Sequence, residues 1–140
     1  MKQLLLLPLF LFFLSARLSG QSNDGPPYHI FSIYFGGGSA YIDAEQIQEL
    51  FKWIDGIEGI ENHEISVHGH TDNICSLQYN QWLSQERCDA AIQRLMEKGI
   101  SRDRISVEEF GELNPVYDNS TLEGRLKNRR VDIIIKPLVL

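Results

Sequence analysis

The order of strand-like and helix-like segments between residues 29 and 136 is the feature that most limits the fold of this chain. Short runs of β-branched and aromatic residues predict four strands. Apolar residues at three- and four-residue spacing predict two long helices, and a third, short one precedes the last strand. The strands are predicted at residues 29–35, 64–70, 105–110 and 130–136. The first helix is predicted to begin after Asp43, the second to end at Lys98, and the third to run from Thr121 to Asn128. This β-α-β-α-β-(short α)-β order indicates an α/β protein of the mixed α+β kind.

The connections and the periodicity predict how these segments pack. Helical crossovers favour parallel neighbours, whereas the last two strands have no long helix between them, which permits antiparallel pairing. We therefore predict a β-α-β-α-β-β sandwich, with one mixed parallel and antiparallel sheet and the helices packed on one face. The spacing also predicts which side chains face the core. They are Ile65 and Val67 in the second strand, Ala44, Ile47, Leu50, Phe51 and Ile54 in the first helix, and Cys88, Ala91, Ile92, Leu95 and Met96 in the second.

The first residues differ from the rest and predict three parts of the chain. A positive start, an apolar run from Leu4 to Leu14 and small residues up to Gly20 are typical of a secretory signal peptide. A membrane anchor is the alternative, but this run is about eleven residues long and a span needs roughly 20. We expect residues 1–20 to be a signal peptide, residues 21–28 a linker, and residues 29–140 one domain that does not span a membrane.

The charge excludes one class of partner. The chain has a formal charge of −6, which falls to −8 if Lys2 and Arg17 are removed with the leader. A chain this acidic is not expected to attract nucleic acid or anionic lipid by its overall charge. Secretion would also place the two cysteines in an oxidising compartment.

Asp72 and Arg87 are the residues that most suggest a binding site. Ligands of open sheets bind beyond the carboxyl ends of parallel strands, and Asp72 follows the second predicted strand. A carboxylate and a guanidinium in one cleft suit a zwitterion, because the first accepts from an ammonium and the second donates to a carboxylate. The alternative interpretation is a turn aspartate and a solvated helix arginine.

Geometry restricts this hypothesis. In one continuous helix over residues 73–87, Asp72 and Arg87 would lie roughly 22 Å apart, too far to share a ligand. The chain must therefore turn back between them, and we expect the second helix to begin near Ser84, a suitable N-cap. Replacing either charged residue by alanine is then expected to abolish binding while the fold is retained.

Two motifs give the chain a family resemblance. Residues 68–90 contain His68-Gly-His-Thr-Asp-Asn, Tyr79-Asn and Leu83-Ser-Gln-Glu-Arg87, which resemble the pattern GHTDxxG…YNxxLSxxRA of the OmpA-like C-terminal domain family. Residues 111–131 resemble its second block, GExxPxxxNxTxxGRxxNRRV. Both blocks occur in order, and the resemblance extends over about residues 29–136.

The resemblance implies a function and a set of site residues. The family, which includes Pal lipoproteins and MotB stator proteins, binds peptidoglycan non-covalently, chiefly at the diaminopimelate of the stem peptide. It implies no enzyme activity, no cofactor and no metal, and a cell-wall-associated place in the periplasm, peripheral to the outer membrane. By position, Asp72 and Arg87 correspond to the pair that binds diaminopimelate, Asn80 and Arg129 line the same groove, and Thr71 and Leu83 are neighbours of it.

The chain departs from the family pattern at two cysteines and three glycines. Cys75 stands where the first motif usually has glycine, and Cys88 where it usually has alanine. A Cys75–Cys88 disulfide would join the Asp72 loop to the Arg87 helix and contribute about 3 kcal/mol in the loop-entropy model. The alternative is two free thiols that pack as small apolar side chains. Gly36-Gly37-Gly38 receives no interpretation from the sequence.

Two other functions compete with peptidoglycan binding. His68-x-His70-x-Asp72 resembles the start of the HxHxDH motif of zinc hydrolases, but Asn73 replaces the last histidine and no later cluster completes a site. The second alternative is a docking module for another outer-membrane or envelope protein, which would use Trp82 and the tail from Pro137 to Leu140.

Overall fold

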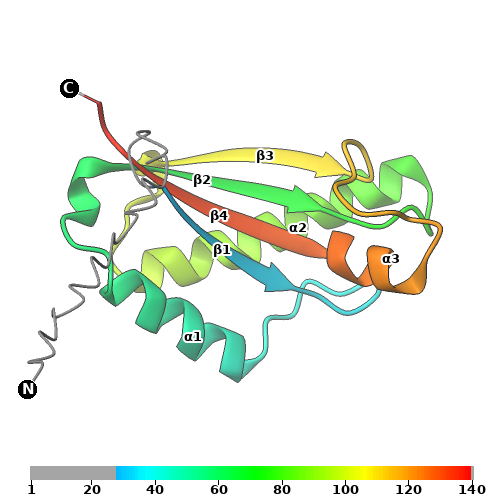
Figure 1. The fold of residues 1–140 in the computed structure, drawn as a ribbon, viewed down its shortest axis with the longest axis horizontal. Coiled ribbons are helices and arrows are strands. Elements are labelled where there is room, and N and C mark those ends of the chain that lie inside the picture. Colours follow the sequence, from blue (N-terminus) through cyan, green and yellow to red (C-terminus); the bar gives the residue numbers. More distant parts are fainter. Residues whose placement is uncertain (1–27, 140) are drawn as a thin grey trace, which may run out of the picture.

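The computed structural model describes residues 28–139 (Figure 1). The predicted signal peptide and nearly all of the predicted linker lie outside the described residues, as does Leu140. The observed order agrees with the predicted one, with two additional short 3-10 segments at residues 60–62 and 102–104. The elements are β1 (His29–Tyr34), α1 (Ala44–Asp55), β2 (His63–His70), α2 (Leu77–Glu97), β3 (Ile105–Gly111), α3 (Leu122–Asn128) and β4 (Arg130–Pro137).

The four strands form one mixed sheet in the order β1-β4-β2-β3. Only β2 and β3 are parallel, and β4 pairs antiparallel with β1 on one side and β2 on the other. The sequence permitted antiparallel pairing between the last two strands, β3 and β4. This expectation is wrong, because β4 lies at the centre of the sheet, between β1 and β2. The α2 crossover carries β3 to the edge, and α3 returns the chain to the gap between β1 and β2 (Figure 1).

One face of the sheet carries the core, and both long helices contribute to it. Ile65 and Val67 of β2 are buried as predicted, and the facing residues of β4 and β1 join them. The predicted helix positions are also in this core, except that Ala44 is exposed and Met96 is 50% exposed. The remaining core members from the strands are Ile33, Ile105, Val131, Ile133 and Ile135.

Side-chain caps fix the helix ends. The carboxylate of Asp43 accepts from the amide of Gln46, and the hydroxyl of Thr121 accepts from the amide of Gly124, as both sequence patterns predict. The prediction for α2 is wrong: the helix begins at Leu77, with Ser76 as its N-cap. Ser84 lies inside the helix, where its hydroxyl donates to the carbonyl of Gln81 and accepts from the amide of Gly111.

A glycine in β2 allows α2 to pack closely against the strand. A Cβ atom on Gly69 would lie 2.6 Å from both the Sγ of Cys88 and the carbonyl oxygen of Ser84. The absence of a side chain at Gly69 therefore allows the buried face of α2 to pack directly against the end of β2. Within residues 28–139, no helix is both long and apolar enough to cross a membrane.

Candidate functional site

A cavity of about 210 Å³ is lined by residues from the loops that follow β1 and β2, from the first half of α2 and from the position just before β4. These segments meet at one end of the sheet (Figure 1). Five of the six predicted binding residues line the cavity, and Thr71 does not. The lining residues are Gly37, Gly38, Asp72, Ile74, Cys75, Tyr79, Asn80, Leu83, Arg87 and Arg129.

The chain reversal that brings Asp72 and Arg87 to one cavity occurs in the loop between β2 and α2. After His70 the chain runs outward through residues 71–76, and α2 then returns along the sheet. Ten residues of helix rise about 15 Å, so the outward loop and the returning helix offset each other. The predicted chain reversal between Asp72 and Arg87 is confirmed, but the turn lies at residues 73–76 and not at Ser84.

The carboxylate of Asp72 is bonded to Arg129. Arg129 Nε donates to Asp72 Oδ2 at 2.6 Å, and the amide of Ile74 donates to Asp72 Oδ1 at 3.1 Å. The two side chains are 17% and 10% exposed, so the ion pair is largely withdrawn from solvent. A partly buried charge-assisted bond of this length is stronger than a surface pair. The predicted partnership of Asp72 and Arg87 is therefore a three-residue group at the cavity, in which Arg129 holds the carboxylate directly.

Arg87 is the largest fully buried side chain, at 1% exposure. Its guanidinium donates to the carbonyls of Ser39, His70 and Gly36 at 2.9–3.0 Å and lies over the ring of Phe35. Burial, and to a smaller degree the charge of Arg129, lowers the pKa of Arg87 to about 10, and Asp72 opposes this shift. The group stays charged at neutral pH. Three of its five N–H donors are used, which leaves two for a ligand.

The three glycines form the loop that borders the two arginines. A Cβ atom on Gly37 would lie 3.5 Å from Nη1 of Arg129, and one on Gly38 would lie 3.5 Å from the hydroxyl of Tyr79. Gly38 also has a φ of +63°, which disfavours other residues. The loop after β1 is thus a wall of the cavity. The run of three glycines was the available signal, but the sequence alone did not connect it to Arg87.

Asn80, Leu83 and Thr71 lie around the charged group. The side-chain amide of Asn80 donates to the carbonyl of Cys75 and, at 2.6 Å, to the carboxylate of Glu112. Leu83 is 4% exposed and lines the cavity with its apolar side chain. Thr71 is buried, and its hydroxyl finds no hydrogen-bond partner among the described residues. Sequence reasoning missed Glu112 and Tyr79, although both stand inside the quoted motifs.

The structure does not contain the predicted disulfide, and both cysteines are free thiols. Cys75 is exposed in the outer part of the loop, whereas Cys88 is buried against Gly69, eleven residues into the returning helix. The helix carries Cys88 about 16 Å beyond Leu77, whereas a disulfide needs Cα atoms within about 7 Å. Burial, with smaller contributions from Glu109 and Asp89, raises the pKa of the Cys88 thiol to about 12.

The zinc-hydrolase alternative is not supported by the described part of the chain. Among residues 28–139, no group of three His, Cys, Asp or Glu side chains is arranged to hold a metal ion. His70 stacks on Phe110, with ring centroids 5.1 Å apart, and Asp72 is bonded to Arg129. Burial lowers the pKa of His68 and, reinforced by Arg130, lowers that of His70 to about 4.

The docking alternative depended on Trp82 and the tail. Trp82 is 50% exposed, and Leu138 and Val139 are 47% and 85% exposed. Leu140 lies outside the described residues. These side chains are accessible, but the described residues do not show what covers them.

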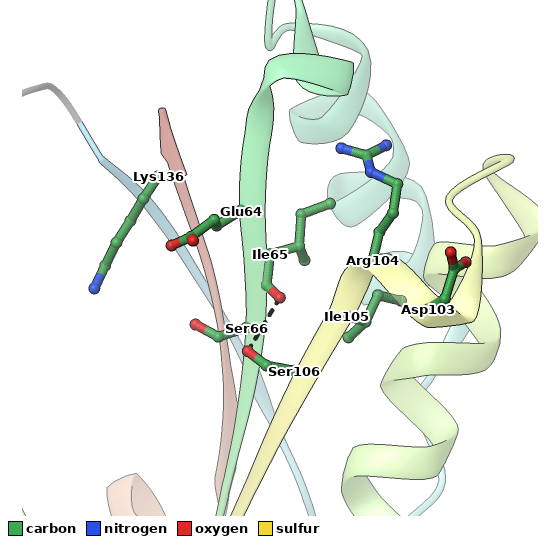
Figure 2. A pocket seen from close by; sticks show the side chains of 8 residues that line it. All are labelled: Glu64, Ile65, Ser66, Asp103, Arg104, Ile105, Ser106 and Lys136. Carbon is green, nitrogen blue, oxygen red and sulfur yellow. Dashed lines mark hydrogen bonds between the residues drawn. The ribbon is translucent and has the colours of Figure 1, made fainter. Parts of the chain in front are cut away.

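A larger hollow of about 580 Å³ lies at the opposite end of the sheet, between the starts of β2 and β3 (Figure 2). Its charged side chains point in different directions. Arg104 turns toward the 3-10 segment at residues 60–62, where it donates to the carbonyls of Ile60 and His63, and Lys136 points away from it. The hollow has no group of converging polar atoms comparable to the cavity beyond β2.

Comparisons with known proteins agree with this geometry. The sequence profile of the OmpA family matches residues 34–129. The chain is similar to the "Peptidoglycan-binding protein ArfA" of Mycobacterium tuberculosis, with 32% identity over 103 residues, which are 74% of this chain and 32% of that protein. The chain therefore spans about a third of the length of this relative.

Solved structures share the fold. The C-terminal domain of Helicobacter pylori MotB has a TM-score of 0.66 at 25% identity, covering 79% of this chain and 88% of that one. The cell wall anchor of the T6SS from Pseudomonas aeruginosa has a TM-score of 0.62 at 28% identity, covering 79% of this chain and 82% of that one.

Proposed function

Because the chain belongs to the OmpA family, we propose that it binds peptidoglycan non-covalently and tethers itself, or a protein joined to it, to the cell wall. A similar protein is named for peptidoglycan binding, and a structural neighbour is described as a cell wall anchor. The proposed role makes and breaks no covalent bond. It places the chain in the periplasm, in association with the wall and peripheral to the outer membrane.

The observation that carries the proposal is the unused hydrogen-bonding capacity of the cavity. Arg87 keeps two N–H donors, and Arg129 uses only its Nε among the contacts of residues 28–139. The carboxylate of Asp72 accepts two hydrogen bonds and has room for about two more. Cationic donors and an anionic acceptor therefore face the same small volume.

Diaminopimelate fits this arrangement. The free end of its side chain carries an ammonium and a carboxylate on one carbon atom, which is the zwitterion that the cavity complements. We expect the carboxylate to bind Arg87 and Arg129 and the ammonium to bind Asp72, with Asn80 and Glu112 at the rim. A volume of about 210 Å³ is smaller than most ligand pockets and suits one end of an amino acid.

Sedimentation with purified sacculi tests the proposal. We expect Asp72→Asn to weaken binding at least tenfold, about 1.4 kcal/mol, because a neutral amide cannot pair with the ammonium. Free diaminopimelate should release the bound chain, whereas Nα-acetyl-lysine amide, which keeps an ammonium but has no carboxylate on the same carbon atom, should not. Unchanged sedimentation of Asp72→Asn, or equal release by both compounds, would reject the cavity as the binding site.

A further inference from the structure

The start of α2 exposes an aromatic pair beside the cavity. Tyr79 is 36% exposed and Trp82 is 50% exposed, and their ring centroids lie 5.5 Å apart at an angle of 48°. Aromatic side chains of this size are usually buried more fully, because each removes a large apolar area from water. The pair therefore presents two contacting aromatic rings to solvent beside the cavity.

The pair is continuous with the cavity. Tyr79 itself lines the cavity, and its hydroxyl lies near Gly38 on the opposite wall. Trp82 follows one turn later on α2, contacts the ring of Tyr79 and does not line the cavity. Helical spacing places exposed glutamines, Gln78 and Gln85, next to Trp82. The rim thus combines flat apolar rings with neutral amide groups.

We infer that Tyr79 and Trp82 form a second subsite, which binds an amino-sugar ring of the glycan strand while the stem peptide occupies the cavity. This inference rests on the proposed function. A pyranose ring presents C–H groups on its faces and hydroxyls on its edge, so a face can stack on an aromatic ring while the edge bonds to amides. The stem peptide is covalently attached to the sugar strand, and the strand must therefore pass near the rim of the cavity that holds the peptide.

The size of the pair favours a sugar over a protein partner. Specific protein interfaces bury about 800 Å² on each partner, far more than two neighbouring side chains provide. One or two sugar rings match the dimensions of the pair. The absence of charge on the two rings also suits a neutral sugar better than a charged peptide.

The test compares two soluble ligands by titration calorimetry. One is a disaccharide-peptide fragment of digested sacculi, and the other is the same peptide after an amidase has removed the disaccharide. We expect the wild-type chain to bind the disaccharide-peptide about fivefold more tightly than the free peptide, as stacking contacts of this kind allow. Trp82→Ala should abolish this ratio and leave the affinity for the free peptide unchanged.

Fluorescence provides a second measurement on the same residue. The chain has two tryptophans, and Trp53 packs against Phe31 in the core. In a Trp53→Phe variant the emission reports Trp82 alone, and we expect a blue shift with the disaccharide-peptide and none with the free peptide. Tyr41→Ala is the matched control, because Tyr41 is exposed and does not line the cavity.

The outcomes separate the two proposals. An unchanged affinity ratio in a folded Trp82→Ala variant would overturn the sugar subsite and leave the peptide site standing. An equal loss of affinity for both ligands would also overturn it, because Trp82 would then contact the peptide. Failure of the wild-type chain to bind even the free peptide would instead overturn the cavity as a peptide site, and the subsite with it. If Trp82→Ala lowers the melting temperature, Trp82→Gln repeats the comparison with a longer side chain that keeps part of the packing of the indole but has no ring.

Discussion

Arg129 and Arg130 are adjacent in the sequence and serve opposite faces of the sheet. Arg129 pairs with Asp72 at the cavity, and Arg130 pairs with Asp132 on the face that carries no helix. Each arginine therefore meets one carboxylate. The two groups differ in the partners of the carboxylate and in their position relative to the cavity.

The carboxylate of the open-face group has the fuller set of partners. Asp132 accepts from the hydroxyl of Ser32 at 2.7 Å and from Nε of Arg130 at 3.0–3.1 Å, and Nε2 of His70 lies 3.8 Å away. The guanidinium of Arg130 also lies over the ring of Tyr117. Asp72, in contrast, accepts two hydrogen bonds, and it lines the cavity together with Arg87 and Arg129. The open-face group therefore stabilises the fold, whereas the cavity group borders a space that a ligand can enter.

The largest effect is expected for Arg87→Ala, because Arg87 both stabilises the fold and lines the cavity. We expect Arg87→Ala to lower the free energy of unfolding by roughly 3–5 kcal/mol, since it removes a buried charged side chain and leaves three carbonyls, that of buried His70 among them, without their donor. Urea denaturation measures this loss. The sequence-based expectation that the fold is retained in this variant is therefore revised.

A matched variant separates the two roles of Arg87. Arg87→Lys keeps the charge but cannot reach three carbonyls in different directions, so its stability should be intermediate. A fully stable Arg87→Ala chain would show that the three buried hydrogen bonds do not hold the Gly36–Ser39 loop.

The open-face group predicts a pH dependence of stability. Burial, reinforced by Arg130, lowers the pKa of His70 from 6.5 to about 4, so the unfolded chain binds more protons than the folded chain between these values. The free energy of unfolding should therefore fall as the pH drops from 6.5 to 4, by up to about 3 kcal/mol.

Urea titrations at several pH values, compared with a His70→Gln variant, measure this contribution. The variant should lose the part of the pH dependence that lies in this window. A wild-type curve that is flat from pH 6.5 to 4 would show that His70 protonates in the folded chain without cost.

Matched amide substitutions compare the two carboxylates directly. Asp132→Asn should lower the free energy of unfolding by about 1–3 kcal/mol, because Arg130 loses its charged partner, and sacculus binding should be unchanged. Asp72→Asn should have the opposite profile, with a smaller loss of stability and weakened binding. Equal effects of both substitutions on binding would show that position at the cavity does not distinguish the two groups.

Local patterns predicted most of the fold. The strands, the α1 and α3 caps and the buried faces follow from spacing and from short-range side-chain chemistry, and they agree with the structure. The position of β4 between β1 and β2 could not be read from the sequence. Sheet order depends on contacts between residues about 65 to 100 positions apart, such as Val67 with Ile133 and Phe31 with Ile133, which no local pattern encodes.

The site was predicted in composition but not in geometry. The charge argument found Asp72 and Arg87, and the resemblance contributed Asn80, Leu83 and Arg129, all of which line the cavity. The start of α2 was wrong because two serines, Ser76 and Ser84, are both suitable caps, and only the packing of Gly69 against Ser84 decides between them. The disulfide was wrong for the same reason, since the earlier helix start separates the two cysteines.

Selective labelling of the two thiols tests the contrast between the accessible cavity and the buried core, and it has the smallest expected effect on binding. N-ethylmaleimide should label Cys75, which is exposed at the cavity, and spare Cys88, whose pKa is raised to about 12 by burial. Mass spectrometry of the native chain should find one label, and two after unfolding.

The labelled chain should bind sacculi about threefold more weakly, about 0.7 kcal/mol, because the adduct occupies part of the rim. The pH dependence from His70 should be unchanged, because that group lies on the other face of the sheet. Failure of the native chain to take up any label would mean that the two cysteines are bridged and that the loop before α2 lies closer to Gly69 than the structure shows.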